Sequence, residues 1–275
     1  MHLDEGRKAA EAGDWVAAGH AFVRAAMEGS AEGAELATQV TVGLVPEADA
    51  GSVEAAALLA GIYLEYFDES ALPDAVRYAR AAAAAGHPAG QRTYGYMLLE
   101  GIGVEEDHDR AAELFRAAAD AGDAYACVNL AQLVDDPDES RHLLEAATRD
   151  GIALAGALLA DRLSELDRDE EALTWYLWAA DRGHTGAMHA AACCYRDGFG
   201  TEPDPVRAVR WFLAMLAHDE GDGDGDGDGD GIHEAIQMAR SGAVDADQVR
   251  EAGRLAGDLG AAEALIGTVW GGGAS

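Results

Sequence analysis

Thiol, imidazole and carboxylate side chains occur at two places where their spacing allows a metal site. The first is the segment around His189, which lies four residues before Cys193 and five before Cys194. Residues four apart share one face of a helix, so the His189 imidazole and the Cys193 thiol could hold a soft metal ion together. A structural zinc ion needs four such ligands, and the neighbouring sequence supplies no others. Adjacent cysteines in an alanine-rich helix are more typical of small core residues, so we predict no metal site here.

The second place is residues 221–231, where glycine and aspartate alternate strictly. A count from Asp226 matches the first, third and fifth positions of an EF-hand calcium loop. The candidate ligands are Asp226, Asp228 and Asp230. Position twelve, where such a loop needs a bidentate glutamate, is Gln237, and a count from Asp222 places His233 there. We therefore predict a flexible acidic linker that repels itself, and we keep weak calcium binding as an alternative.

Signatures of catalysis are missing from the sequence. It contains no Gly-x-Ser-x-Gly elbow, no phosphate-binding loop ending in Gly-Lys-Ser/Thr and no His-Glu-x-x-His helix. Gly101 and Gly103 follow a helix-like segment and not a strand, which does not fit a dinucleotide-binding fold. We predict no catalytic residues, no cofactor and no enzymatic activity. A small-molecule hydrolase on the same scaffold is the less favoured alternative.

The charge balance limits the class of partner. The 275 residues include 51 Asp and Glu against 19 Lys and Arg, a formal net charge of −32. Nucleic acids and anionic membranes are bound through clustered Lys and Arg, so neither is expected as a partner. A protein or peptide partner with basic character is favoured instead.

The remaining composition predicts a soluble, folded protein. Hydrophobic residues make up 49% of the chain, which argues against disorder throughout. No secretory signal and no membrane-spanning stretch are visible. Three cysteines do not suggest a disulfide scaffold. We expect a cytoplasmic protein, and the oligomeric state is left open.

One sequence pattern recurs along the chain. An alanine-rich segment ends in glycine, and another alanine-rich segment follows at once. The closing glycines are Gly29, Gly86, Gly122, Gly151 and Gly183. Glycine at a helix end adopts the left-handed conformation readily, so each copy of the pattern indicates two helices joined by a tight junction. His87 and His184 lie just after a closing glycine, where we expect solvated loop residues.

Each repeat predicts a first helix after the closing glycine and a second helix before the next one. The predicted first helices cover 91–100, 125–134, 154–163 and 187–195. The second helices carry large residues such as Tyr78 and Phe115 at helical spacing from alanines. Gly95, Ala131, Ala160 and Ala192 stand at one common position in the first helices, where close packing is expected. The predicted fold is therefore all-α, an α-solenoid that buries apolar faces by stacking helix pairs.

The segments 94–124 and 192–214 resemble the Sel-one-like repeat family, a relative of the tetratricopeptide repeats. Both carry its Gly-x-Gly residues (Gly101 and Gly103; Gly198 and Gly200) and its Ala-x-x-Leu/Trp-Phe pattern, and the first also carries Tyr94-Gly95-Tyr96, whereas the second carries Tyr195. The resemblance is specific in these two segments and extends across about 51–220. It implies a right-handed superhelix of antiparallel helix pairs that serves as a protein-interaction scaffold and is usually not an enzyme.

Four segments follow from this interpretation. They are 1–50, with N-terminal capping helices and a degenerate repeat; 51–220, with the repeats; 221–231, the Gly-Asp linker; and 232–275, with C-terminal capping helices and a frayed tail. Within the first segment and its border we expect helices over 30–44 and 52–66. Near the C-terminus we expect two or three helices within 232–240 and 246–266.

The resemblance also implies that the first helices line a concave groove. Positions that would face it are Arg92, Tyr96, Tyr125, Asn129, Gln132, His189 and Arg196, with Thr93 and Asp161 beside them. The two arginines could clamp a carboxylate, the tyrosines could act as aromatic anchors, and the two amides could bond a peptide backbone. The other interpretation is that all of these are ordinary solvated residues.

Overall fold

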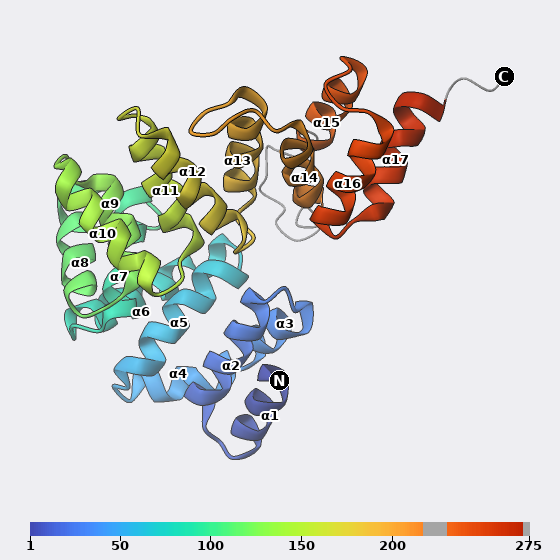
Figure 1. Ribbon diagram of the computed structural model, residues 1–275. Coiled ribbons are helices and arrows are strands. Elements are labelled where there is room, and N and C mark those ends of the chain that lie inside the picture. Colours follow the sequence, from blue (N-terminus) through green and yellow to red (C-terminus); the bar gives the residue numbers. More distant parts are fainter. Residues whose placement is uncertain (217–229, 272–275) are drawn as a thin grey trace. The chain divides into compact units, whose positions relative to one another are not determined.

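The computed structural model describes residues 1–216 and 230–271, and throughout these residues the regular structure is helical (Figure 1). Consecutive helices pack as antiparallel pairs, with α5 on α6, α7 on α8, α11 on α12 and α13 on α14. The prediction of an all-α solenoid is confirmed. Contacts group the chain into two compact units, Met1–Ala146 and Ala147–Ser275, here called the N-terminal and C-terminal units.

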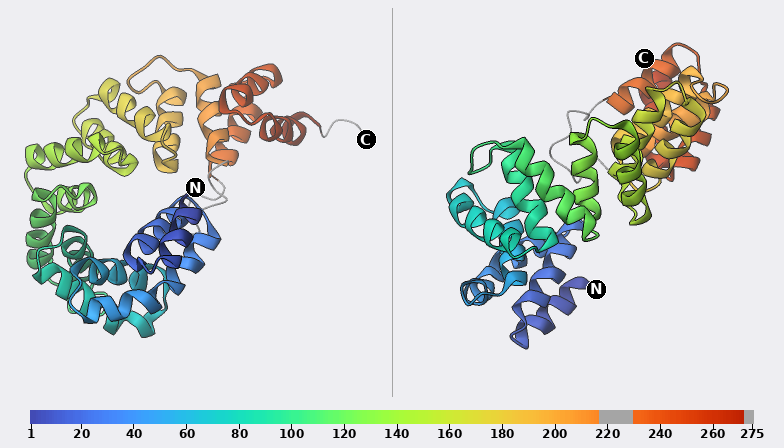
Figure 2. Two further views of the ribbon diagram at one scale, coloured as in Figure 1. Left: turned by 90° about the horizontal axis from the view of Figure 1, so that it is seen from below. Right: turned by 90° about the vertical axis from the view of Figure 1, so that its left-hand side faces the viewer.

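The N-terminal unit runs from α1 to most of α10 (Figure 2). Its helices are α1 (His2–Glu11), α2 (Trp15–Met27), α3 (Ala31–Gln39), α4 (Thr41–Asp49), α5 (Val53–Tyr66), α6 (Leu72–Ala84), α7 (Pro88–Glu100), α8 (His108–Asp120), α9 (Ala124–Leu133) and α10 (Pro137–Arg149), with a short 3-10 turn η1 (Glu69–Ala71). The first helices of its repeats are α5, α7 and α9, and neighbouring members of this series are in contact.

The C-terminal unit contains the helices that follow α10. Its helices are α11 (Ala153–Ser164), α12 (Asp169–Ala180), α13 (Thr185–Asp197), α14 (Pro205–Leu216), α15 (Asp230–Arg240), α16 (Ala246–Ala256) and α17 (Leu259–Trp270). Helix α14 packs against both α15 and α16.

The junctions between repeats have a common hydrogen-bonding pattern. At Gly86, where φ is 79°, the backbone N–H bonds the Ala83 carbonyl and the next N–H, of His87, bonds the Ala82 carbonyl. This is the Schellman arrangement that satisfies the last carbonyls of a helix. His87 is also the N-cap of α7, because its Nδ1 accepts the Gly90 N–H at 3.4 Å. One residue therefore ends α6 and begins α7.

The same positive φ occurs at the other predicted closing glycines, Gly29, Gly122, Gly151 and Gly183. It occurs also at Gly13, Gly51 and Gly257, which the sequence interpretation did not recognise as closing glycines. The residue after each of these three caps the following helix with its side chain; the caps are Asp14, Ser52 and Asp258.

Two histidines at these junctions differ from the prediction. His87 and His184 are partly buried N-caps and not solvated loop residues, and the Nδ1 of His184 accepts the Ala187 N–H at 3.0 Å. The expectation was wrong because it treated the residue after glycine as part of a loop, whereas no loop separates the two helices.

The close-packing position of the first helices behaves as predicted. Ala131, Ala160 and Ala192 are buried. A Cβ added to Gly95 would lie 2.9 Å from Cε1 of the fully buried Phe115. Glycine is needed here because the second-helix ring occupies the space of a side chain.

The ends of the chain differ in detail from the expected helices. The helix expected over 30–44 is divided into α3 and α4 at Val40. Next to this break the Thr38 and Thr41 hydroxyls each donate to a carbonyl three residues earlier, at 2.7 Å, which competes with regular helix bonding. The segment 246–266 is divided into α16 and α17, because Gly257 ends one helix and Asp258 caps the next.

Candidate functional site

A cavity of about 420 Å³ lies in the N-terminal unit among α2, α5 and α7, with one residue from α9. Its walls are largely apolar, with Val23 and Met27 from α2 and Ala57, Leu58 and Ile62 from α5. Polar side chains also line it: His20, Glu54, Glu65, Tyr66, His87, Arg92, Thr93 and Tyr125. Apolar walls with a few polar groups are typical of binding sites, and this volume falls within their usual range.

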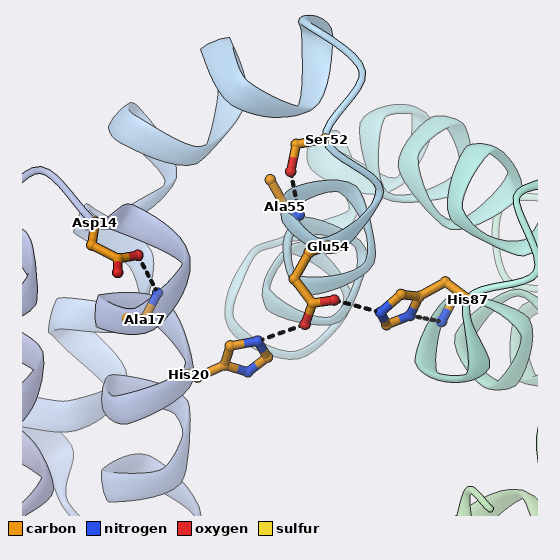
Figure 3. Close-up of polar contacts among 8 residues, drawn as sticks. Asp14, Ala17, His20, Ser52, Glu54, Ala55 and His87 are labelled. Atoms are coloured by element: carbon orange, nitrogen blue, oxygen red, sulfur yellow. Dashed lines mark hydrogen bonds and ion pairs between the residues drawn. The ribbon is translucent and has the colours of Figure 1, made fainter. Parts of the chain in front are cut away.

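Three of the polar residues form a connected cluster (Figure 3). The Glu54 carboxylate bridges two histidines, with Oε1 at 2.9 Å from His20 Nε2 and Oε2 at 2.8 Å from His87 Nε2. His20 comes from α2, Glu54 from the first turn of α5, and His87 from the N-cap of α7. The cluster therefore links three helices that line the cavity.

The capping role of His87 determines the tautomer of its neutral ring. Its Nδ1 accepts the Gly90 N–H, so Nε2 carries the hydrogen and donates to Glu54. This hydrogen bond is the main reason why the pKa of Glu54 lies below its ordinary value, with a smaller contribution from the His20 hydrogen bond. Glu54 is therefore a carboxylate across the neutral pH range.

Arg92 is paired within the chain. Its Nε donates to Asp123 Oδ2 at 3.0 Å, and its guanidinium lies 5.5 Å from the centre of the Tyr125 ring. Asp123 also caps α9 by accepting the Ala126 N–H at 2.9 Å. The positive charge of Arg92 is thus balanced by a carboxylate that the fold holds in place.

The space above Gly61 remains open. Gly61 is in the interior of α5 and lines the cavity, and a Cβ added to it would have no neighbour within 4 Å. Glycine in a helix costs up to about 1 kcal/mol relative to alanine. Unlike Gly95, Gly61 has no close packing partner, and its effect is to leave room in the cavity.

The structure divides the groove residues expected from the sequence into three groups. Arg92, Thr93 and Tyr125 line the cavity. Tyr96, Asn129 and Gln132 lie on α7 and α9 outside its lining; Tyr96 and Gln132 are exposed, and the Gln132 amide donates to the Val128 carbonyl of its own helix at 3.4 Å.

The third group, His189 and Arg196, lies on α13 of the C-terminal unit. The Arg196 guanidinium bonds both carboxylate oxygens of Asp197, at 2.9 and 2.7 Å, and bonds Glu234 at 2.9 Å. The His189 ring meets the Phe212 ring edge-on, with centres 5.7 Å apart. Both side chains have partners within the chain, and their role in binding stays a prediction.

The candidate metal sites have different outcomes. Cys193 Sγ lies 3.8 Å from His189 Nδ1, and burial raises the pKa of both thiols, that of Cys194 to about 11. Among the residues with described side chains, no group of three His, Cys, Asp or Glu is arranged to hold a metal ion. Asp226 and Asp228 lie outside the described residues, and Asp230 is the first residue of α15.

Sequence reasoning missed His20, Glu54, Gly61 and Glu65. The signal that finds three of the cavity residues is the closing glycine Gly51. Counted from Gly51, Glu54 occupies the position that Tyr125 has after Gly122, Leu58 that of Thr93 after Gly86, and Gly61 that of Tyr96. These three were predicted groove positions in the neighbouring repeats, so recognising Gly51 extends the same face to α5.

Comparisons with known proteins agree with this architecture. The family model described as Sel1 repeat matches residues 88–123, 162–184 and 185–219. These segments include α7 with α8 and α13 with α14. No curated protein matches the sequence. None of the described helices is both long and apolar enough to cross a bilayer.

Two solved structures show the same fold. One is c5321, a protective antigen present in uropathogenic Escherichia coli strains that displays an SLR fold; its TM-score is 0.69 at 20% identity over 94% of this chain. The chain spans 60% of the length of c5321. The other is a Sel1 repeat protein from Oxalobacter formigenes, with a TM-score of 0.59 at 22% identity over 78% of this chain and 96% of that one. Sel1 repeat proteins are typically protein-interaction scaffolds. The chain therefore contains three segments that match the Sel1 repeat, and it shares the helical fold of these two proteins.

Proposed function

We propose that the chain is a non-enzymatic scaffold that binds a protein segment or peptide along the faces of α5, α7 and α9. The observation that carries this proposal is the 420 Å³ cavity, which is lined by successive first helices of the repeats. Its apolar walls offer a site for one anchoring side chain of a partner, and such anchors supply most of the affinity in an interface.

The neighbouring residues of the same face extend the proposed site beyond the cavity. Tyr125, which lines the cavity, is 46% exposed, and Tyr96 on α7 is 40% exposed. Tyrosines with large exposed rings are frequent contact residues in interfaces. Asn129 and Gln132 follow on α9, where their amides can bond an extended backbone. His189 and Arg196 on α13 remain proposed contacts in the C-terminal unit.

The chemistry of the cavity supports binding over catalysis. The residues that line it include two histidines and two glutamates but no serine or cysteine. The Thr93 hydroxyl belongs to a buried residue, only 7% exposed. Covalent catalysis needs a nucleophile within hydrogen-bond reach of its base, and the hydrogen bonds of His20 and His87 lead to Glu54.

The test is a substitution that fills the cavity with an additional side chain of the chain itself. Gly61→Leu places an isobutyl group in open space within α5, and Gly267→Leu is the matched control, because a Cβ there also has no neighbour within 4 Å. Peptides are first selected from a random displayed library against the wild-type chain, and their affinities for both variants are then measured by fluorescence anisotropy.

We expect Gly61→Leu to weaken the selected peptides by at least about tenfold, the effect of losing one buried anchor. Gly267→Leu should bind them as the wild type does. Failure to select any peptide, or equal affinity of the two leucine variants, would contradict a peptide-binding role for the cavity.

A further inference from the structure

The positive and negative charges of the side chains that line the cavity do not cancel. Glu54 and Glu65 contribute two carboxylates from α5, and Arg92 contributes the one permanently charged cation of the lining. Asp123 neutralises Arg92 through the 3.0 Å hydrogen bond. Apart from the two histidines, the side chains of the cavity and Asp123 therefore carry an excess of two negative formal charges.

Glu65 is the carboxylate left without a partner. Both oxygens of Glu54 are bonded to histidines. Within the described residues, by contrast, Glu65 makes no hydrogen bond or ion pair, and it is exposed at the cavity. The group that the cavity lacks is a cation that can reach Glu65.

The open space above Gly61 leads directly to this carboxylate. Residues four apart in a helix are neighbours on one face, and Glu65 follows Gly61 by four residues in α5. Val23 of α2 and Ile62 of α5 border the same cavity, and such apolar walls suit the methylene stem of a long basic side chain. Tyr66 and Tyr125 add aromatic rings to the lining, which attract a cationic head group.

We propose that this cavity binds an arginine side chain of a partner peptide, with the aliphatic stem over Gly61 and the guanidinium on Glu65. The inference rests on the proposed peptide-binding function and specifies the residue that the peptide supplies. Arginine fits better than lysine because its planar head both stacks on tyrosine and bonds a carboxylate with two N–H groups.

The experiment uses a series of blocked pentapeptides, acetyl-Gly-Gly-Xaa-Gly-Gly-amide, in which Xaa is arginine, lysine, citrulline or glutamate. Citrulline keeps the shape of arginine and removes its charge. Binding to the full chain is measured by isothermal titration calorimetry at low salt. The variants are Glu65→Gln, with Glu100→Gln as its control, since Glu100 is exposed on α7 outside the cavity lining, and Gly61→Leu.

We expect saturable binding of the arginine peptide, with the citrulline peptide about tenfold weaker or more because a charged hydrogen bond is lost. Glu65→Gln should cause a similar loss for the arginine peptide and none for citrulline, while Glu100→Gln should change neither. Gly61→Leu should abolish binding.

Three results overturn the inference: no saturable binding of the arginine peptide, equal binding of citrulline or glutamate, or equal effects of Glu65→Gln and Glu100→Gln. If library peptides of other composition still bind and are lost in Gly61→Leu, the peptide-binding function stands and only the arginine assignment fails. If neither the library nor the pentapeptides bind, both fail.

Discussion

At the scale of single residues, the histidines that begin α7 and α13 combine two roles. Each accepts a backbone N–H at Nδ1, which requires that nitrogen to be unprotonated. The corresponding residue before α9, Asp123, caps with a carboxylate oxygen instead. The repeats therefore use chemically different caps at one structural position, and an imidazole cap loses its acceptor when Nδ1 is protonated.

His184 provides the clearest test of such a response. Burial lowers its pKa from an ordinary value near 6.5, and Asp161 opposes this shift only in part. The folded chain thus binds the proton less readily than the unfolded chain, so stability is full above about pH 6.5 and is lost as the pH falls through the folded pKa. We expect His184→Asn, which retains a capping oxygen, to remove this loss.

The measurement is the free energy of unfolding of wild type and His184→Asn in urea between about pH 8 and about pH 5. The two curves should separate below about pH 6.5, by at most about 1.4 kcal/mol per pH unit for one proton. His108→Asn serves as the control, because the His108 side chain is 64% exposed and the N-cap of α8 is Asp107. Parallel curves for wild type and His184→Asn would rule out the linkage.

At the scale of the helices, two glycines in the first helices act in opposite ways. Gly95 of α7 makes room for Phe115, whereas Gly61 of α5 faces the open cavity. Both have ordinary helical backbone, so alanine at either position gains helix propensity. The space around the added methyl group decides the net effect.

We expect Gly61→Ala to raise the free energy of unfolding by about 0.5–1 kcal/mol. Gly95→Ala should lower it by about 1–3 kcal/mol because the Phe115 ring must move in a packed core. Urea unfolding of the two variants, followed by circular dichroism, gives both values. A loss of stability in Gly61→Ala would show that the cavity does not accept even a methyl group.

Much of this arrangement could be predicted from the sequence. The closing glycines located the junctions, and the small residues at one common position located the helix contacts, because both depend on local backbone and packing requirements. The cavity could not be predicted in full, because His20 and Glu54 lie 34 residues apart and meet only through the packing of α2 on α5. Gly51 carried the missing signal, but the short spacing from Gly29 hid its role.

At the scale of the whole chain, the net charge of −32 dominates the electrostatics. Many of the ion pairs join residues three apart on one helix and are largely exposed, such as Arg110 with Glu113 and Arg254 with Glu251. Pairs of this kind contribute about 0–1 kcal/mol each. Repulsion among the unpaired carboxylates opposes folding over the full length of the chain.

Salt screens both the attraction within ion pairs and the repulsion among carboxylates. The change in stability with added salt therefore shows which of the two is larger. We expect added sodium chloride to raise the melting temperature by several degrees, since about 1 kcal/mol corresponds to roughly 2–4 °C in a chain of this size. Differential scanning calorimetry across a salt series measures this, with sucrose as an uncharged control. A melting temperature that falls with salt would mean that the exposed ion pairs outweigh the repulsion.

The single-residue junctions also determine where the chain can be rearranged. Between Gly86 and α7, or Gly183 and α13, no spare residue exists, because the residue after glycine completes one helix and starts the next. The turns inside the repeats differ in length, from residues 134–136 after α9 to residues 101–107 after α7. We therefore expect insertions and exchanges of modules to be tolerated inside a repeat, where the unit to exchange is a second helix together with the first helix that follows it.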